Sequence, residues 1–462
     1  MELVELSDDV IYCIILLVSI PIAHVVKLCN NSFTKKAICT AMGVSIACIT
    51  CRWHIFHSIV TTLISCILIK ISGPRKCHTY LFFWGFGYLL FFRTCHYIGL
   101  PQAPALSNAV QLLLTLRMVG IGFEIHDTHT SSKREDCSSE EMALKKKYQE
   151  VNPSSIDIIL YAYCFLGQFT GPYYKYRTYI DMINNDRSAD IPTLDAFVSR
   201  MKAVPFLIVI FVGFSYFFSI HYVESGEFFT RSFLFRLFYM VPMFTIFRAR
   251  MYIAWLVSEC MSMASTLGAY PVQCKARCGK GPTDLAALDE ANSKDVKEIK
   301  YDFETIHNLD IYGCDLAPRV RDGLRSWNMT VQYWLASCVH HRVPKSLAPF
   351  KVAITMAVSA FWHGVHPGYY LSFGLVPIFV AAEDRMVRVF RKEGDAGKMF
   401  DWINWFLKMR AFDYMCMGFL LLRLDYTLAY WHSVYFIGHI MGVIFLVIGR
   451  LKPLPKSEKK KE

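Results

Sequence analysis

Residues 10–28 read VIYCIILLVSIPIAHVVKL, an apolar run of 19 residues with one lysine near its end. A helix needs about 20 mainly apolar residues to cross the hydrocarbon core of a bilayer. The run is longer than the apolar core of a cleaved signal peptide, and it lacks a basic leader and a small-residue cleavage site. It therefore predicts a first membrane span that stays attached to the chain.

The rest of the 462-residue chain repeats this pattern. Hydrophobic residues make up 54% and charged residues 19%, against roughly 25% charged in soluble domains. Further apolar runs lie at 37–51, 54–71, 79–98, 106–123, 156–171, 203–222, 233–247, 251–267, 348–362, 368–382, 412–424 and 429–449. Several have near 15 residues, which favours tilted or re-entrant helices. We expect an all-α polytopic membrane protein with about 10–11 transmembrane helices.

The chain is expected to form one membrane-embedded domain over residues 1–451. Two hydrophilic stretches, at about 130–155 and 274–302, interrupt the apolar pattern and predict loops. The 16 cysteines lie mostly inside apolar runs, and their spacing matches no zinc-ribbon pattern. The sequence also lacks internal repeats and the inverted pair of broken spans that is typical of secondary transporters.

The basic residues predict which parts face the cytoplasm. Lys and Arg outnumber Asp and Glu by 49 to 38, an excess that cytoplasmic loops explain better than nucleic-acid binding. The basic tail at 452–462 ends KKKE, which places Lys459 and Lys460 four and three positions from the end. This matches a dilysine retrieval signal. We therefore expect a multi-pass protein of the endoplasmic reticulum membrane with a cytosolic C-terminus.

Charged residues lie inside or at the ends of several apolar runs. They are Arg93, Arg117, Glu124, Arg236, Arg248, Arg250 and Glu259. Charges inside a membrane usually face an internal, partly hydrated cavity. An arginine near a span end can instead reach the interface with its long side chain, and this alternative stays open for individual residues.

The C-terminal third holds the richest candidate chemistry. Trp327 precedes Asn328, and His363 stands between Trp362 and Gly364 at the end of an apolar run. Apolar burial keeps an imidazole neutral, and a neutral imidazole can accept a proton. The neighbouring glycine removes a side chain, which lets another molecule come close. This pattern makes the histidine a candidate general base.

The spacing predicts that this base lies near Asn328. If 328–341 and 349–363 are helices, the short link with Pro344 makes them antiparallel. Each helix then rises about 20 Å, so the second helix returns His363 to the depth of Asn328 in the membrane.

Two rival interpretations of this segment are weaker. His363 and His366 are three residues apart, but no acidic ligand stands at metal-binding spacing and Pro367 ends the helix. Cys338 lies ten residues from Asn328, and nothing in the sequence pairs it with the histidine. We expect neither a metal site nor a cysteine-bound intermediate.

Several stretches of the chain resemble signatures of the membrane-bound O-acyltransferase (MBOAT) family, and they stand in the order typical of that family. The strongest is SAFWHGVHPGYYLSF at 359–373, which follows the Trp-Asn pair at 327–328. TGPYYKYRTYID at 170–181 and FRARMYIAWLVSE at 247–259 agree as well. Residues 431–439 resemble the YxxxYFxxH motif of the lysophospholipid branch, with Trp in place of the first Tyr. The chain is identified as similar to this family over about residues 10–450.

The resemblance implies a helix bundle around an internal tunnel and an acyl transfer. Acyl-CoA is the implied co-substrate, with no further cofactor. The implied acceptor is the free hydroxyl of a lysophospholipid, in particular lysophosphatidylinositol, with arachidonoyl as the preferred acyl chain. His363 takes the place of the family's base. Asn328 then either stabilises the developing oxyanion or positions the attacking hydroxyl, and the sequence leaves both roles open.

Other residues are expected to bind the substrates. Trp327, Trp362 and Gly364 flank the two candidate catalytic residues. Basic side chains near the cytosolic mouth are expected to meet the phosphates of CoA, with positive-inside anchoring as the alternative. These are Lys175, Arg177, Arg248 and Arg250.

Two other functions stay open. The first is a family member with another acceptor, such as a protein, a sterol or diacylglycerol. The absence of a large lumenal domain and of a long polar extension before the first span disfavours these acceptors. The second is a lipid transporter or scramblase, for which the histidine and asparagine motifs have no use.

Overall fold

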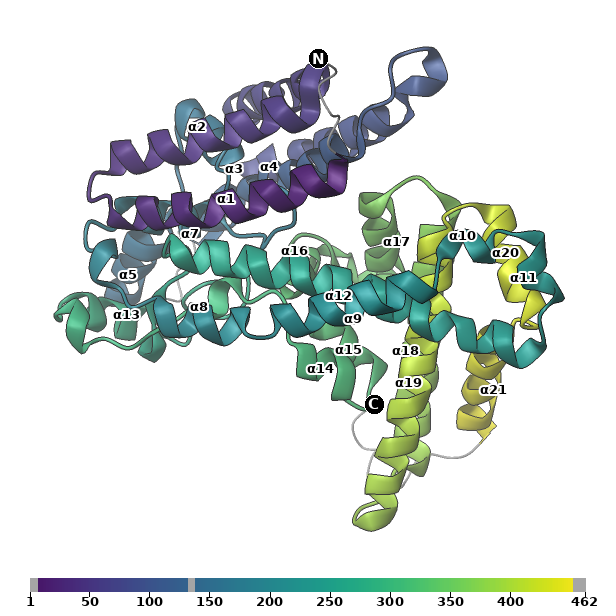
Figure 1. Ribbon diagram of the computed structural model, residues 1–462. Coiled ribbons are helices and arrows are strands. Elements are labelled where there is room, and N and C mark those ends of the chain that lie inside the picture. Colours follow the sequence, from purple (N-terminus) through teal and green to yellow (C-terminus); the bar gives the residue numbers. More distant parts are fainter. Residues whose placement is uncertain (1–6, 132–137, 452–462) are drawn as a thin grey trace. The chain divides into compact units, whose positions relative to one another are not determined.

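A computed structural model describes residues 7–131 and 138–451 of the chain (Figure 1). Its secondary structure is almost entirely α-helical, which confirms the predicted all-α class. The tail at 452–462, with the lysines predicted as a retrieval signal, Lys459 and Lys460, lies outside the described residues.

The packing of the backbone divides the chain into two compact units, and each is described by itself. The first unit holds Met1–Val204, Ala254–Asn308 and Asn328–Cys338. The second unit holds Pro205–Ile253, Leu309–Trp327 and Val339–Glu462. The single domain expected for 1–451 stays a prediction.

The first unit is built on long N-terminal helices (purple and blue in Figure 1) and a set of short ones. Its longer helices are α1 (Asp8–Leu28), α2 (Ser32–Cys51), α3 (Ile55–Thr94) and α4 (Ala105–Ser131). The shorter ones are α5 (Ser139–Gln149), α6 (Ser155–Ala162), α7 (Tyr176–Asn184), α8 (Leu194–Met201), α13 (Leu285–Asn292) and α16 (Met329–Cys338). In the hydrophilic stretch after residue 264, β1 (Tyr270–Pro271) pairs antiparallel with β2 (Tyr301–Asp302).

Local chemistry explains where these helices begin and how they pack. The Ser7 hydroxyl accepts a hydrogen bond from the first turn of α1, and Ser154 with Asp157 forms a capping box at the start of α6. Helices α3 and α4 pack along each other. They meet closely at Gly122, where a Cβ would lie 2.5 Å from the Leu81 side chain. A larger residue there would push the two helices apart.

In the described part of the second unit, helices joined by turns make up the fold. Its helices are α9 (Val204–Phe217), α10 (Ile220–Val223), α11 (Gly226–Thr230), α14 (Ile311–Leu316), α15 (Val320–Arg325), α17 (Lys351–His363), α18 (Pro367–Phe390), α19 (Asp395–Leu421), α20 (Leu424–Ser433) and α21 (Ile437–Leu451). Helix α18 packs against α17, α19 and α21. A Cβ at Gly368 would lie 2.1 Å from the Gly418 carbonyl oxygen, so α18 begins in direct backbone contact with α19.

Some predicted runs differ from the observed helices. The runs at 233–247 and 251–267 form one helix, α12 (Phe233–Ala264), because the good helix formers between them continue it. The run at 156–171 is helical only as far as Ala162, because the carbonyls that follow turn toward the buried guanidinium of Arg117.

Five segments of the described chain are long and apolar enough to cross a membrane. They are Asp8–Leu28, Ser32–Ile98, Ala105–Ser131, Leu194–Val223 and Phe233–Ala264, and the bent pair α20 and α21 makes six if it counts as one span. The chain is thus a multi-pass membrane protein.

This number is lower than the 10–11 expected spans, for two reasons. The runs at 368–382 and 412–424 lie in α18 and α19, whose remaining turns carry many charges. The second reason is that Ser32–Ile98 counts as one segment, although its 67 residues are about three times what one crossing needs. A left-handed Gly73 interrupts this segment. The exact number of spans stays a prediction.

Candidate active site

His363 is the last residue of α17 in the second unit. The helix stops there because the chain becomes extended at Gly364 and Pro367 begins α18 three residues further on. The imidazole is half-buried among aromatic rings. Its ring centroid lies 5.2 Å from that of Phe373 and 5.1 Å from that of Phe419. The helix end and the rings hold the candidate base in one orientation.

The glycine and tryptophan beside the histidine pack against the same group. A Cβ at Gly364 would lie 2.4 Å from the ring of Tyr369, so this ring fills the space that the sequence suggested was open to another molecule. Trp362 is buried and meets the His363 ring edge to face at 4.7 Å. Trp362 therefore supports the imidazole directly, and Gly364 makes room for the Tyr369 ring, whose centroid lies 5.9 Å from that of His363.

Trp327 also belongs to the second unit, and it packs against α12. Its ring stacks on Phe247 at 5.9 Å and lies 5.7 Å from that of Tyr252. These contacts are made with the basic-aromatic segment at 247–259, so two of the sequence motifs meet in space.

Asn328, the residue after this tryptophan, belongs to the first unit. Its φ of 49° is left-handed, a conformation that Asn tolerates better than most residues. Its carbonyl accepts from Gln332 N at 3.0 Å, so α16 begins directly after it. The side-chain oxygen Oδ1 is buried and has no hydrogen-bond partner among the described residues.

The start of α16 is held by a residue that the sequence did not predict, Asn308. Its backbone carbonyl accepts from Met329 N at 2.8 Å, and its Oδ1 accepts from Thr330 N at 3.1 Å. The Thr330 hydroxyl donates to the same Oδ1 at 2.6 Å. Asn308 therefore caps α16 from another part of the chain and fixes the backbone next to Asn328.

Two sequence motifs converge on this cap. The Asn308 N–H donates to Glu259 Oε1 at 2.8 Å, and Glu259 ends the segment at 247–259. Tyr173, in the segment at 170–181, donates its N–H to the Thr330 hydroxyl at 2.9 Å. No periodicity or motif singles out Asn308 in the sequence, because its role depends on residues that are distant along the chain.

The neighbour of Asn308 carries an ion pair. His307 Nδ1 lies 3.0 Å from Glu304 Oε2. Burial lowers the pKa of His307, but the hydrogen bond with Glu304 and the negative charges of Glu259 and Glu304 together outweigh it, so the pKa is raised from its ordinary value. This pair stabilises the turn that leads into the cap.

Two of the basic candidates, Lys175 and Arg177, lie at the start of α7. The Lys175 ammonium stands over the ring of Tyr333, 5.4 Å from its centroid. Burial lowers the pKa of Lys175, but Tyr333 and Glu124 outweigh this effect and raise it. Arg177 pairs with Asp181 across one helical turn at 2.9 Å. The first unit thus places two cations within one segment of chain.

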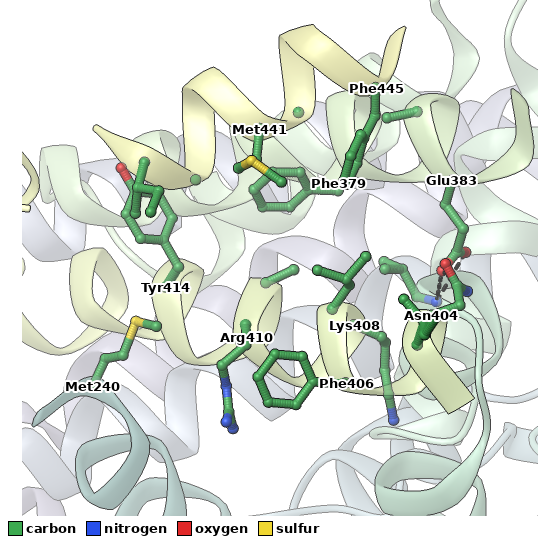
Figure 2. A pocket seen from close by; sticks show the side chains of 18 of the residues that line it. Met240, Phe379, Glu383, Asn404, Phe406, Lys408, Arg410, Tyr414, Met441 and Phe445 are labelled. Carbon is green, nitrogen blue, oxygen red and sulfur yellow. Dashed lines mark hydrogen bonds between the residues drawn. The ribbon is translucent and has the colours of Figure 1, made fainter. Parts of the chain in front are cut away.

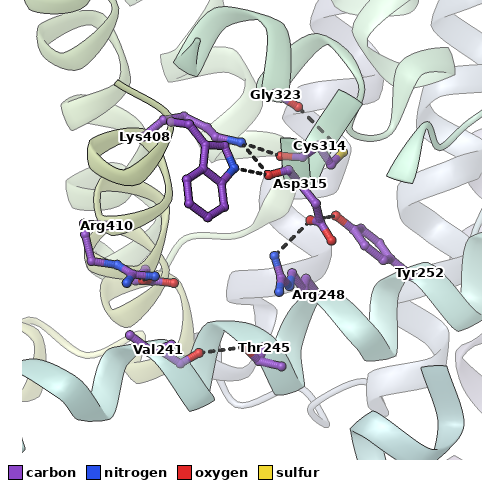
Figure 3. Close-up of polar contacts among 11 residues, drawn as sticks. Val241, Thr245, Arg248, Tyr252, Cys314, Asp315, Gly323, Lys408 and Arg410 are labelled. Atoms are coloured by element: carbon purple, nitrogen blue, oxygen red, sulfur yellow. Dashed lines mark hydrogen bonds and ion pairs between the residues drawn. The ribbon is translucent and has the colours of Figure 1, made fainter. Parts of the chain in front are cut away.

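Arg248 and Arg250 lie on α12, in the part that belongs to the second unit. Figure 3 shows Arg248 paired with the Asp315 carboxylate at 2.9 Å, and the Tyr252 hydroxyl donates to the same oxygen. The buried Lys408 donates to the Cys314 carbonyl at 2.8 Å. Arg250 is exposed. The two arginines therefore differ, since one is tied to α14 and the other reaches the surface.

The second unit also contains an apolar cavity of about 660 Å³ (Figure 2). Side chains of α12, α18, α19 and α21 line it, among them Phe379, Met441 and Phe445. Glu383 is one of the few polar lining residues, and it accepts hydrogen bonds from Asn404 and from a backbone N–H. The size and lining suit an apolar ligand.

Comparisons with known proteins identify the family of the chain. Residues 72–423 match the family model of the membrane-bound O-acyltransferases. The chain is 44% identical to a membrane-bound acylglycerophosphatidylinositol O-acyltransferase of Xenopus laevis, over 97% of this chain and 94% of the relative. The corresponding protein of Homo sapiens is 41% identical over 95% and 93%, and that of Drosophila melanogaster 32% over 96% and 92%. The chain belongs to the membrane-bound O-acyltransferase family.

Proposed function

We propose that this enzyme transfers a fatty acyl chain from acyl-CoA to the free hydroxyl of lysophosphatidylinositol and so produces phosphatidylinositol. The observation that carries the proposal is the similarity, along nearly the whole chain, to relatives named for acylglycerophosphatidylinositol acylation. The preference for an arachidonoyl chain and the location in the endoplasmic reticulum membrane are parts of the same proposal. The apolar cavity of the second unit supports a lipid substrate, because a hydrocarbon chain is stable in such surroundings.

In this proposal His363 is the general base. The lipid hydroxyl attacks the thioester carbonyl, a C–O bond forms, and the hydroxyl proton passes to the imidazole. The C–S bond then breaks, and the sulfur of CoA takes up the proton that the imidazole carries. The acyl group moves directly to the lipid, with no acyl-enzyme.

Asn328 acts beside the base. The side-chain Oδ1, buried without a partner among the described residues, supports a hydrogen bond to the substrate. His363 and Asn328 belong to different units, so their pairing in one site remains part of the proposal and rests on the antiparallel arrangement of the helices.

Substrate binding is assigned to the residues around this pair. Trp327, Trp362 and Gly364 shape the walls of the site. The cations meet the phosphates of CoA, because Arg and Lys form charge-assisted hydrogen bonds with phosphate oxygens. We assign this role to Lys175, Arg177, Arg248 and Arg250.

The experiment is an assay of the purified protein in detergent. Arachidonoyl-CoA is offered with a panel of lysophospholipids, sterol and diacylglycerol, and the wild type is compared with His363→Ala. Loss of a general base is expected to lower the rate by 10²–10⁴-fold. His366→Ala is the matched control, since this exposed histidine lies only three residues away.

The outcomes separate the alternatives. Transfer to lysophosphatidylinositol that is lost in His363→Ala and kept in His366→Ala supports the proposal. Transfer to a different acceptor keeps the chemistry and changes the substrate. Lipid movement without any transfer would instead indicate a transporter.

A further inference from the structure

Asn308 carries an amide group whose orientation the structure fixes. The side chain is fully buried. Its oxygen must face Thr330, because the Thr330 backbone N–H at 3.1 Å can only donate. A flipped amide would place two donors against each other. The Nδ2 group therefore points away from the cap of α16.

This Nδ2 group is buried, yet it has no hydrogen-bond partner among the described residues. Buried polar groups in native proteins are nearly always paired, so an exception calls for a bound ligand or an ordered water. The capping of α16 does not explain it, since the cap uses only the two oxygens of Asn308. The N–H donors are available for another molecule.

A second unpaired atom belongs to the residue directly before those that Asn308 caps. Asn328 precedes the two capped residues, and its buried Oδ1 also lacks a partner among the described residues. One amide thus offers donors and the other an acceptor. An acyl transfer presents an acceptor for such donors, because the thioester carbonyl oxygen becomes negatively charged during attack.

We propose that Asn308 is a second catalytic amide, whose Nδ2 N–H groups donate to the thioester carbonyl oxygen. This inference rests on the proposed acyl transfer. It assigns Asn308 two tasks, one for each end of its amide. The oxygen holds α16 in place, and the nitrogen stabilises the negative charge on the substrate.

The first test separates these two tasks by substitution. Asn308→Asp keeps an oxygen for the cap and loses the N–H donors. Asn308→Ser loses the donors without placing a second carboxylate near the buried Glu259. We expect both variants to lower kcat about 10²-fold, the effect of removing one oxyanion donor. Thr330→Val is the control, because it weakens the cap and leaves Nδ2 intact. Its kcat should fall by no more than about tenfold.

The second test measures contact with the carbonyl oxygen itself. Two unreactive analogues of acyl-CoA are compared, a ketone that keeps this oxygen and a thioether that lacks it. The wild type is expected to bind the ketone about tenfold more tightly, the size of one hydrogen bond. In Asn308→Ser this preference should disappear, whereas a purely structural residue would weaken both analogues alike.

The outcomes distinguish this inference from the proposed function. An active wild type whose Asn308→Asp and Asn308→Ser variants keep their kcat and the ketone preference would overturn the inference alone. Equal losses of kcat in Asn308→Ser and Thr330→Val, with the ketone preference kept in both, would do the same. A wild type without acyl transfer would overturn the proposed function and this inference with it.

Discussion

Arg117 and Asn308 are both buried polar side chains of the first unit, but they differ in how completely their atoms are paired. The Arg117 Nη1 donates to the carbonyls of Tyr161, Ala162 and Cys164 at 2.8–3.2 Å. Its Nη2 donates to the Leu166 carbonyl and to a tyrosine hydroxyl. The amide of Asn308 is paired only at its oxygen.

The difference indicates that Arg117 serves only the fold, whereas Asn308 has atoms left for another molecule. Arg117 binds the carbonyls that the end of α6 would leave unpaired, and so it stabilises the irregular backbone after Ala162. Each bond it can make there serves the fold. Asn308 also holds irregular backbone, but its Nδ2 donors have no partner among the described residues. A buried polar group with unpaired atoms calls for a bound water, ion or ligand.

Arg117→Lys should have the largest effect on the folded state. A single ammonium cannot reach the carbonyls that the guanidinium fork binds, and each carbonyl left unpaired costs about 1–3 kcal/mol. Several such losses approach the total stability of a domain, so we expect no folded protein after purification, or a Tm at least about 10 °C lower. Size-exclusion chromatography and thermal unfolding in detergent would show this. The exposed Arg231→Lys is the matched control, and a normal Tm for Arg117→Lys would contradict the structural role.

Glu259→Ala should have an intermediate effect, and it tests the comparison at a residue that supports the cap of α16. Glu259 is fully buried, accepts from Asn308 N and lies 3.2 Å from Arg200. Removing one partner of a buried ion pair costs about 3–5 kcal/mol, so unfolding should occur at lower temperature and the activity should fall with it. Glu259→Gln keeps an acceptor for the Asn308 N–H, and we expect a loss of only about 1–2 kcal/mol.

The measurement for both variants is the Tm together with kcat. In contrast to the Asn308 variants, stability and activity should decline together here, because Glu259 supports the cap without offering a group to the substrate. A Glu259→Ala protein with the wild-type Tm would show that the cap does not depend on this carboxylate.

Lys147→Ala should have the smallest effect. The ammonium lies 2.6 Å from Asp289 and connects α5 with α13, but both side chains are largely exposed. Exposed ion pairs contribute little to stability. Moreover, the Tyr148 hydroxyl also donates to Asp289 and would remain. We expect unchanged activity and a Tm within about 2 °C of the wild type. A larger drop would mean that paired polar groups stabilise this protein even at its surface.

The sequence alone determined the class of the protein and the position of its motifs. Apolar runs of the length of a bilayer require helices, because a backbone in lipid must pair its own hydrogen bonds. The helix ending at His363 was predicted for the same kind of reason, since the apolar run stops there and Pro367 follows. The family and its acyl-transfer chemistry also follow from short motifs such as the one at 359–373, whose residues are neighbours along the chain.

Only the tertiary structure decided which polar atoms are paired. The run at 156–171 gives no sign that its helix stops at Ala162, because Arg117 comes from another helix. Asn308 stands in no motif, and its cap of α16 depends on the approach of Thr330 from 22 residues away. Hydrophobicity acts through composition and period, which a sequence displays directly. Hydrogen bonding depends on distance and direction in space, and these are fixed only when distant segments pack together.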